Sequence, residues 1–370
     1  MYKIGAGYNK FFDIKNNILK IPELVSFIEI GIEEIQDLPS ENSLIGKEVS
    51  LHLARAPLVE DLSVQLEYIS FLQEILKISK LKNLNITSIG IHLSGSRQTN
   101  VGKLGIADIY IPTKNNLERI YEFLRQIKKL NLPIWFENAS FYSKDKKSLI
   151  KTWQHINKIC LDNNCKMVID IGHILIESNN VGLKPEIILG MIDWDRVAEI
   201  HLSGIKSNID GCMHDSHNLP VHEKVWDLLG STLDLVNKNN IIFTIEHTSP
   251  NWVDNRNEFL NDFLELEIYL NKEKEEISFN DKSFGYTVGY LKYMVKTSIP
   301  LLDKACHQRK ISLDSIFIEW IDKNINFGKR VVFSKKELPL SERNNSVELF
   351  EDFLKYAKSI LINLDENKND

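Results

Sequence analysis

The stretch AEIHLSGIKSNIDGCMHDSHNLPVHEKVWDLL, from Ala198 to Leu229, decides how the whole chain is interpreted. It starts within a short apolar strand over residues 197–202, passes through a polar loop with two glycines, and enters a helix near residue 222. Its metal-capable side chains include four histidines and a carboxylate, which are His201, His214, Asp215, His217 and His222. A lone histidine is usually a core or surface residue, but imidazoles grouped with a carboxylate suit zinc, manganese and iron. The stretch therefore predicts metal chemistry.

Outside this stretch, short apolar runs alternate with longer amphipathic segments. Strands are expected at residues 3–5, 25–30, 49–53, 89–93, 134–137, 166–171, 197–202 and 241–246. The clearest helical patterns cover residues 61–80, 117–130, 147–163, 221–238 and 256–271. Repeated strand-then-helix units imply parallel strands joined by crossover helices, and eight of them in about 270 residues predict an α/β protein, a (β/α)8 TIM barrel. A doubly wound open sheet is the alternative, although its Gly-rich dinucleotide fingerprint is missing.

The alternation stops after the charged run KEKEE at residues 272–276. We therefore predict a metal-binding catalytic barrel over residues 1–276 and a mainly helical C-terminal region over residues 277–370. Within that region, helices are expected at 284–305, 312–323 and 346–364, and a short strand at 331–333. Two interpretations of this region stay open. It is either a cover for one end of the barrel or a docking surface for a peptide and the partner that presents it.

Composition narrows the class of protein. The net charge of −6 gives no general attraction for nucleic acid or for an anionic membrane. No apolar run is long enough to span a bilayer, and the N-terminus lacks the pattern of a signal peptide. The four cysteines form no C-x-x-C pair and fit no zinc ribbon, so free thiols in a reducing compartment are expected. We expect a cytoplasmic protein without nucleic-acid or membrane partners.

Six consecutive predicted strands end in a metal-capable side chain, which is where a TIM barrel places its catalytic residues. Residues two apart share one face of a strand, so Ser50 lies on the face of His52 and Glu199 on the face of His201, while Leu51 and the other apolar neighbours face the helices. Buried charges cost several kcal/mol unless they are paired or ligated, so this converging set requires a cation or a dense polar network.

The candidate ligands are numerous enough for two or three metal ions with bridging carboxylates, because one catalytic zinc typically needs three protein ligands. They are His52, His92, Glu137, Asn138, Asp170, His173, His201, Asp215, His217 and Glu246. The set has no cysteine, which favours iron, manganese or zinc over copper(I).

The ordered motifs LHLA, HLSG, FENAS, DIGH, EIHLSG, HDSHNLPVHEKVW and IEHT resemble a known family. This family comprises the multinuclear non-heme iron-dependent oxidative enzymes, which are relatives of the methanobactin-biosynthesis oxidase. The fold of the family is similar to that of xylose-isomerase-like TIM barrels. The strongest match is EIHLSG followed by DSHNLPVHEKVW, and the resemblance covers roughly residues 1–250. One departure is DIGH at residues 170–173, where many members carry asparagines after the aspartate.

The resemblance implies that the candidate ligands hold two or three Fe(II)/Fe(III) ions, with Glu137, Asp170 and His201 as the catalytic residues. Glu29, in FIEIG, matches a carboxylate near the family's site. The implied activity is an O2-using modification of a ribosomally made precursor peptide, often at cysteine, and often with a small partner protein that presents the peptide.

Two other functions remain open. The first is a zinc or manganese hydrolase or isomerase of the xylose-isomerase-like or endonuclease-four-like barrels. A nuclease needs a basic groove for DNA, and only Arg55 and Arg97 lie close to a site loop. The second is a peptide-binding or assembly subunit with a vestigial site. The presence of a candidate ligand at each of these strand ends argues against this second function.

Overall fold

The computed structural model describes residues 2–13, 19–95, 109–140, 143–209, 211–233, 235–236 and 240–271, together with 316, 320, 353–357 and 359. The chain divides into two units, Met1–Lys272 and Glu273–Asp370. In the second unit the described residues are helical and fall within the helices predicted over 312–323 and 346–364, and the rings of Trp320 and Phe353 pack 5.7 Å apart. The domain boundary predicted at 276, the helix over 284–305 and the strand over 331–333 lie outside the described residues.

The first unit is built on a closed barrel of eight parallel strands. They are β1 (Lys3–Gly7), β2 (Val25–Gly31), β3 (Glu48–Leu53), β4 (Asn85–His92), β5 (Ile134–Glu137), β6 (Lys166–Asp170), β7 (Val197–Leu202) and β10 (Ile242–Ile245). Each strand pairs with its neighbour in chain order, and β10 pairs with β1 to close the ring. The predicted TIM barrel is confirmed, and a closed ring excludes the open sheet.

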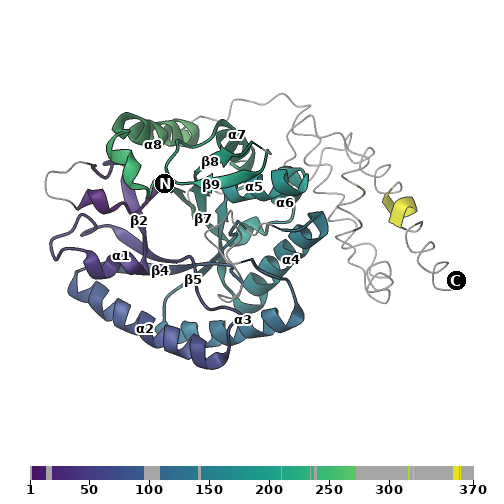
Figure 1. Cartoon of the computed structure of the whole chain (residues 1–370), viewed down its shortest axis with the longest axis horizontal. Coiled ribbons are helices and arrows are strands. Elements are labelled where there is room, and N and C mark those ends of the chain that lie inside the picture. The colour runs from purple at the N-terminus through teal and green to yellow at the C-terminus, as the bar shows by residue number, and fades with distance from the viewer. Residues whose placement is uncertain are drawn as a thin grey trace. The chain divides into compact units, whose positions relative to one another are not determined.

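Helices surround the barrel, as α2, α3 and α4 do along one side in Figure 1. The α-helices are α1 (Ile32–Asp37), α2 (Leu62–Leu81), α3 (Lys114–Ile127), α4 (Lys146–Asn163), α5 (Ile171–Val181), α6 (Pro185–Leu189), α7 (Glu223–Thr232) and α8 (Arg256–Asn271). Short 3-10 helices are η1 (Lys10–Phe12), η2 (Lys128–Leu130), η3 (Trp194–Arg196) and η5 (Pro250–Val253). None of the helices in the described part of the chain has the length and apolar character needed to cross a membrane.

The helix predicted over residues 221–238 is shorter than expected. It starts at Glu223, because the imidazole of His222 accepts a hydrogen bond from the backbone N–H of Lys224 and caps the helix. It ends at Thr232, where Ser231 and Thr232 hydroxyls bond back to backbone carbonyls of the last turn. Such side chains compete with helical hydrogen bonding, which the apolar pattern alone did not reveal.

The polar loop expected after β7 is instead a hairpin of β8 (Gly204–Ser207) and β9 (Met213–Ser216). The two strands are antiparallel, and Ile205 lies opposite Asp215. Gly211, with φ of +80°, occupies a left-handed backbone conformation in the turn that glycine adopts readily. Each strand has only four residues, too few for alternation to mark them in the sequence.

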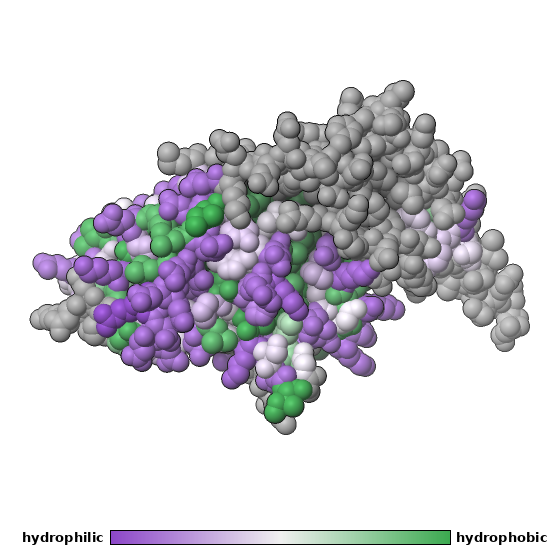
Figure 2. Space-filling view, turned by 90° about the horizontal axis from the view of Figure 1, so that it is seen from above, coloured by the Kyte–Doolittle hydropathy of each residue, from purple (hydrophilic) through white to green (hydrophobic). Residues whose placement is uncertain are grey.

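The barrel has an apolar outer face and a partly polar interior. Leu51, Ile91 and Ile200 point outward and are fully buried under the helices. On the inner face, Phe27 and Trp135 stack with ring centroids 6.1 Å apart. They precede Glu29 and Glu137 by two residues on the same faces, so they close the interior beneath these carboxylates. On the outside, hydrophilic residues cover much of the visible surface of the described barrel, with hydrophobic residues scattered between them (Figure 2).

Candidate metal centre

Among the residues that the structure describes, three groups of side chains at the carboxyl ends of the strands have the spacing to hold metal ions. In each group the candidate ligand atoms lie within 4.8 Å of one another. The groups are His52, His92 and Glu137; Glu29, His201 and Glu246; and Glu137, Asp170 and His173. Glu137 belongs to the first and third groups, and its Oε1 lies 3.6 Å from Nδ1 of His201 in the second, so the groups form one connected cluster.

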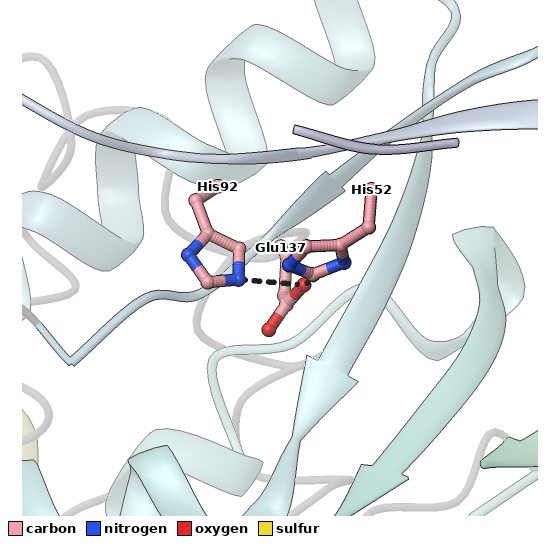
Figure 3. Close-up of side chains that lie close together, drawn as sticks. All are labelled: His52, His92 and Glu137. Atoms are coloured by element: carbon pink, nitrogen blue, oxygen red, sulfur yellow. Dashed lines mark ion pairs between the residues drawn. The ribbon is translucent and has the colours of Figure 1, made fainter. Parts of the chain in front are cut away.

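The first group comes from the ends of β3, β4 and β5 (Figure 3). The barrel register pairs His52 with Gly90 and His92 with Glu137, which places the imidazoles side by side over one carboxylate. Nε2 of His92 lies 3.1 Å from Oε2 of Glu137, and Nδ1 of His52 lies 3.7 Å from the same oxygen. Gly90 leaves room for this arrangement, because a Cβ there would lie 3.1 Å from Oε1 of Glu29.

The second group surrounds His201, which is completely buried. Its Nδ1 lies 3.6 Å from Oε1 of Glu137 and 3.5 Å from Oε1 of Glu246. On the opposite side of the ring, Nε2 lies 3.3 Å from a carboxylate oxygen of both Glu29 and Glu199. One imidazole therefore connects four carboxylates.

Two carboxylates beneath His201 are held by further contacts. Oε2 of Glu29 also accepts a hydrogen bond of 3.0 Å from Nδ1 of His52, which links the first and second groups. Oε1 of Glu199 accepts a hydrogen bond from the hydroxyl of Thr244. Burial, reinforced by the negative charge of Glu29, raises the pKa of Glu199 to about 7.

The third group is organised by the start of α5. Oδ1 of Asp170 caps the helix by accepting the backbone N–H of His173 at 2.6 Å. Nδ1 of His173 donates to the backbone carbonyl of Asn138 at 2.7 Å, because a carbonyl oxygen can only accept. The charges of Asp170 and Asp215 outweigh burial and raise the pKa of His173, and its Nε2 lies 3.6 Å from Oδ2 of Asp215. A metal ion bound at Nε2 would take the place of the proton on that nitrogen.

Asp215, from β9, and His217, just after it, adjoin this cluster without belonging to the three groups. Oδ2 of Asp215 lies 2.7 Å from Nε2 of His217, and the same nitrogen lies 3.5 Å from Oε2 of Glu246. Nδ1 of His217 contacts the hydroxyl of Thr248 at 3.0 Å. The hairpin thus adds a carboxylate and an imidazole to one side of the cluster.

The charges in the cluster depend on one another. Burial disfavours the ionised form of Glu137, but the imidazoles of His92 and His201 hold its pKa well below the usual range. Burial alone would lower the pKa of His52, but Glu29 and Glu137 outweigh burial and raise it to about 10. Positive charge among these carboxylates is therefore favoured, and a divalent cation would supply it.

Several buried polar atoms make no hydrogen bond, although buried polar groups normally do. They include both carboxylate oxygens of Glu137, both ring nitrogens of His92 and His201, and Oδ2 of Asp170. They converge from imidazole and carboxylate groups, the donor types that iron, manganese and zinc prefer. On this observation the residues fit one or more divalent metal ions.

Most of the predicted ligands are brought together. His52, His92, Glu137, Asp170, His173, His201 and Glu246 lie in the three groups, and Asp215 and His217 adjoin them. Asn138 is the exception, because both atoms of its side-chain amide bond to the backbone of Asp170. Glu199 was noted only as sharing the inner face with His201. That spacing was the signal for its place in the cluster.

Histidines outside the candidate set have other partners. His247 follows the last strand, but its Nε2 contacts Oδ2 of Asp262 at 2.7 Å and its ring stacks 3.9 Å from that of Trp252. His222 caps α7. Neither residue belongs to a candidate group, although His247 stands directly after Glu246 at the end of the last strand.

Curated relatives match only part of the chain. A UPF0276 protein of Acaryochloris marina is 28% identical over 122 residues, which cover 33% of this chain and 44% of the relative. A UPF0276 protein of Vibrio vulnificus is 34% identical over 102 residues, covering 27% of this chain and 35% of the relative. The chain thus spans less than half the length of these curated relatives.

Solved structures with a similar chain path include an IOLI protein with a bound zinc atom, at 12% identity and a TM-score of 0.49, covering 73% of this chain and 100% of the other. Another is D-psicose 3-epimerase from Clostridium cellulolyticum H10, at 15% identity and a TM-score of 0.45, covering 71% and 98%.

The family comparison covers more of the chain. The sequence model of a family described as RiPP precursor modification enzyme MbnB/TglH/ChrH matches residues 49–261, where RiPP denotes a ribosomally made and post-translationally modified peptide. The match runs from β3 into α8 and includes every member of the three groups except Glu29. It spans more than half of the sequence and the strand ends that carry the cluster, so the chain belongs to the MbnB/TglH/ChrH family of RiPP precursor modification enzymes.

Proposed function

We propose that this protein is a multinuclear iron-dependent oxidase that uses O2 to modify a ribosomally made precursor peptide at a cysteine residue. One observation carries the proposal. The two oxygens of Glu137 face different imidazoles, with Oε2 3.1 Å from His92 and Oε1 3.6 Å from His201. A buried carboxylate whose oxygens point in two directions would be able to hold a metal ion on each side.

The ligands would divide among two or three positions. His52, His92 and Glu137 would hold one ion, and Glu137, Glu29, His201 and Glu246 a second. Asp170, His173, Asp215 and His217 would supply a third position on the side of the hairpin. Asn138 would not be a ligand in this scheme, since its amide holds the Asp170 backbone.

When bound, the irons would supply the electrons for O2 activation and a soft-ligand position for a cysteine thiolate. The protein would hold the ligands in place and exclude water. Glu199, which accepts a hydrogen bond from Thr244, would orient His201 from beneath, since a group that contacts the second ring nitrogen orients a metal-bound imidazole. Glu137, Asp170 and His201, which are fully buried, are the proposed catalytic residues.

Substrate would approach where the cluster is least buried. The side chains of His52 and His217 are 15% and 22% exposed, against 10% or less for the other group members and Asp215. A pocket of about 430 Å³ adjoins His52 and is lined by Leu53, Tyr68 and Phe71 among others. We propose that residues flanking the modified cysteine enter here, with or without a small partner protein that presents the peptide.

The test is O2 uptake coupled to a change in peptide mass. Anaerobically purified protein loaded with Fe(II) is mixed with the precursor peptide encoded beside its gene, with and without O2. We expect O2 consumption and a mass change that both require the peptide cysteine, and a Cys-to-Ser peptide is the control. A mass change that proceeds without O2 and with zinc or manganese would instead support a hydrolase or isomerase. Peptide binding without any mass change would support the non-enzymatic alternative.

A further inference from the structure

One edge of β9 is covered by a side chain of α5 instead of by another strand. Oδ1 of Asn180 accepts the backbone N–H of Met213 at 2.8 Å, and Nδ2 of Asn180 donates to the carbonyl of Met213 at 3.0 Å. A single amide thus satisfies both backbone groups of Met213, as a neighbouring strand would. The preceding residue, Asn179, donates to the carbonyl of Gly211 in the hairpin turn at 3.1 Å.

This clamp lies two residues from the cluster. Met213 is the first residue of β9 and Asp215 is the third, with Oδ2 of Asp215 between Nε2 of His217 and Nε2 of His173 at 2.7 and 3.6 Å. His173 lies in the first turn of α5, and Asn180 lies in its last turn. One helix therefore carries an imidazole at one end and fixes the strand of the facing carboxylate at the other.

The base and the outer half of the hairpin are held differently. At the base, Gly204 packs so closely that a Cβ there would lie 2.5 Å from the carbonyl oxygen of Leu219. At the tip, Ile209 is fully exposed. Asn180 meets β9 between these two regions, at the point from which the strand leads to Asp215. Loss of the clamp would leave the Met213 backbone unpaired and free to exchange its hydrogen bonds for water.

We infer that Asn180 is a positioning residue that sets the distance between Asp215 and His173, and thereby lets Asp215 and His217 share a divalent cation with His173. The inference rests on the proposed metal centre, to which it adds a residue that contacts none of the ligands through the hydrogen bonds of its side chain. It predicts that the effect is greatest at the position of Asp215 and His173, because the groups around His52 and His201 contain no residue of the hairpin.

The experiment is an anaerobic titration of the metal-free, full-length protein with Fe(II), followed by equilibrium dialysis, for the wild type and matched variants. Asn180→Ala should bind the most weakly held cation roughly 10- to 100-fold more weakly, the range found when residues that orient a ligand are removed. Asn180→Asp keeps the acceptor for the Met213 N–H but loses the donor, so its affinity for Fe(II) should lie between those of the wild type and Asn180→Ala. Asn179→Ala removes side-chain hydrogen bonds to Asn180 and to the carbonyl of Gly211 in the turn but none to Met213, so it should bind like the wild type.

A double-mutant cycle separates positioning from general destabilisation. If Asn180 acts through Asp215, the variant carrying both Asn180→Ala and Asp215→Asn should bind no more weakly than Asp215→Asn alone. Additive losses of affinity in the double variant would overturn the inference about Asn180. So would an Asn180→Ala variant that binds Fe(II) like the wild type while Asp215→Asn is impaired. Neither result would contradict the proposed function. A wild type that binds no Fe(II) would contradict the proposed function first.

Discussion

The side-chain amide of Asn138 makes two hydrogen bonds of 2.9 Å with the backbone of Asp170, one from Nδ2 to the carbonyl and one to Oδ1 from the N–H. The last ladder pair between β5 and β6 is Glu137 with Val168, so this amide continues the ladder past the point where the strands part. The backbone carbonyl of Asn138 also accepts from His173. One residue therefore fixes two neighbours of Glu137.

Replacing Asn138 by alanine should lower the free energy of unfolding by about 2 kcal/mol, because it leaves two buried backbone groups of Asp170 unpaired. Urea unfolding of the metal-free protein measures this difference. Asn157→Ala is the matched control, since the Asn157 amide donates one hydrogen bond to the Met191 carbonyl and should cost less. Equal stability of Asn138→Ala and wild type would mean that the ladder extension contributes nothing.

Removing metal should destabilise the barrel markedly. The cluster brings Glu29, Glu137 and Glu246 around one buried imidazole, and a cation that binds only the folded state stabilises it by mass action. At a free metal concentration of about 100 times Kd, the stabilisation is about 2.7 kcal/mol. Thermal unfolding before and after chelation, with metal added back as the control, should show a reversible fall in Tm. An unchanged Tm would argue against a cation at this site.

The His247–Asp262 pair should behave as a structural element. Oδ2 of Asp262 accepts the backbone N–H of Val221 at 2.9 Å and contacts His247 at 2.7 Å. Because burial lowers the pKa of His247, Asp262→Ala leaves the Val221 N–H and a ring nitrogen of His247 without a hydrogen-bond partner, which should cost about 3 kcal/mol of stability. Its metal content, measured on folded protein, should match the wild type. His217→Ala provides the opposite case in metal content, with metal lost, because His217 is one of the proposed ligands. Loss of metal from Asp262→Ala at full stability would contradict this assignment.

Acid sensitivity should come in part from His155, which lies away from the cluster on α4. Burial, with the positive charges of Lys151 and Lys158, lowers its pKa, and its Nδ1 contacts the hydroxyl of Tyr110 at 2.9 Å. Since the unfolded chain takes up the proton first, this stabilisation is complete above a pH of about 6.5 and is lost as the pH falls below it. His155→Gln should lose less stability than wild type between pH 7.5 and 5.5 in urea unfolding. A parallel decline in both proteins would exclude this contribution.

The strand-end ligands could be predicted because two local rules agree. Period-two alternation turned His52, His92 and His201 away from the apolar face, and the barrel rule placed their strand ends at one mouth. That Glu137 belongs to two of the three groups could not be predicted, since this depends on the register of β4 with β5 in the closed barrel. The β8–β9 hairpin was missed because its strands are too short to show a period.

The task of Asn138 also escaped prediction from sequence. A Glu-Asn strand end is equally compatible with an amide that binds metal and an amide that bonds to backbone. Only the position where β5 and β6 separate decides between them, and that position follows from packing across the whole barrel. The clamp by Asn180 is similar, because the amide reaches a strand 33 residues further along the chain.

The most direct test of the central claim is the iron content of anaerobically purified protein, measured by elemental analysis with Mössbauer spectroscopy, in wild type and in Glu137→Gln. Glu177→Gln, which alters another buried carboxylate outside the three groups, is the control. We predict two or three irons per chain in wild type and in the control, consistent with a bridging carboxylate, and loss of at least one iron in Glu137→Gln. A wild type that holds a single zinc, or a Glu137→Gln variant with the full iron content, would contradict a centre built around Glu137.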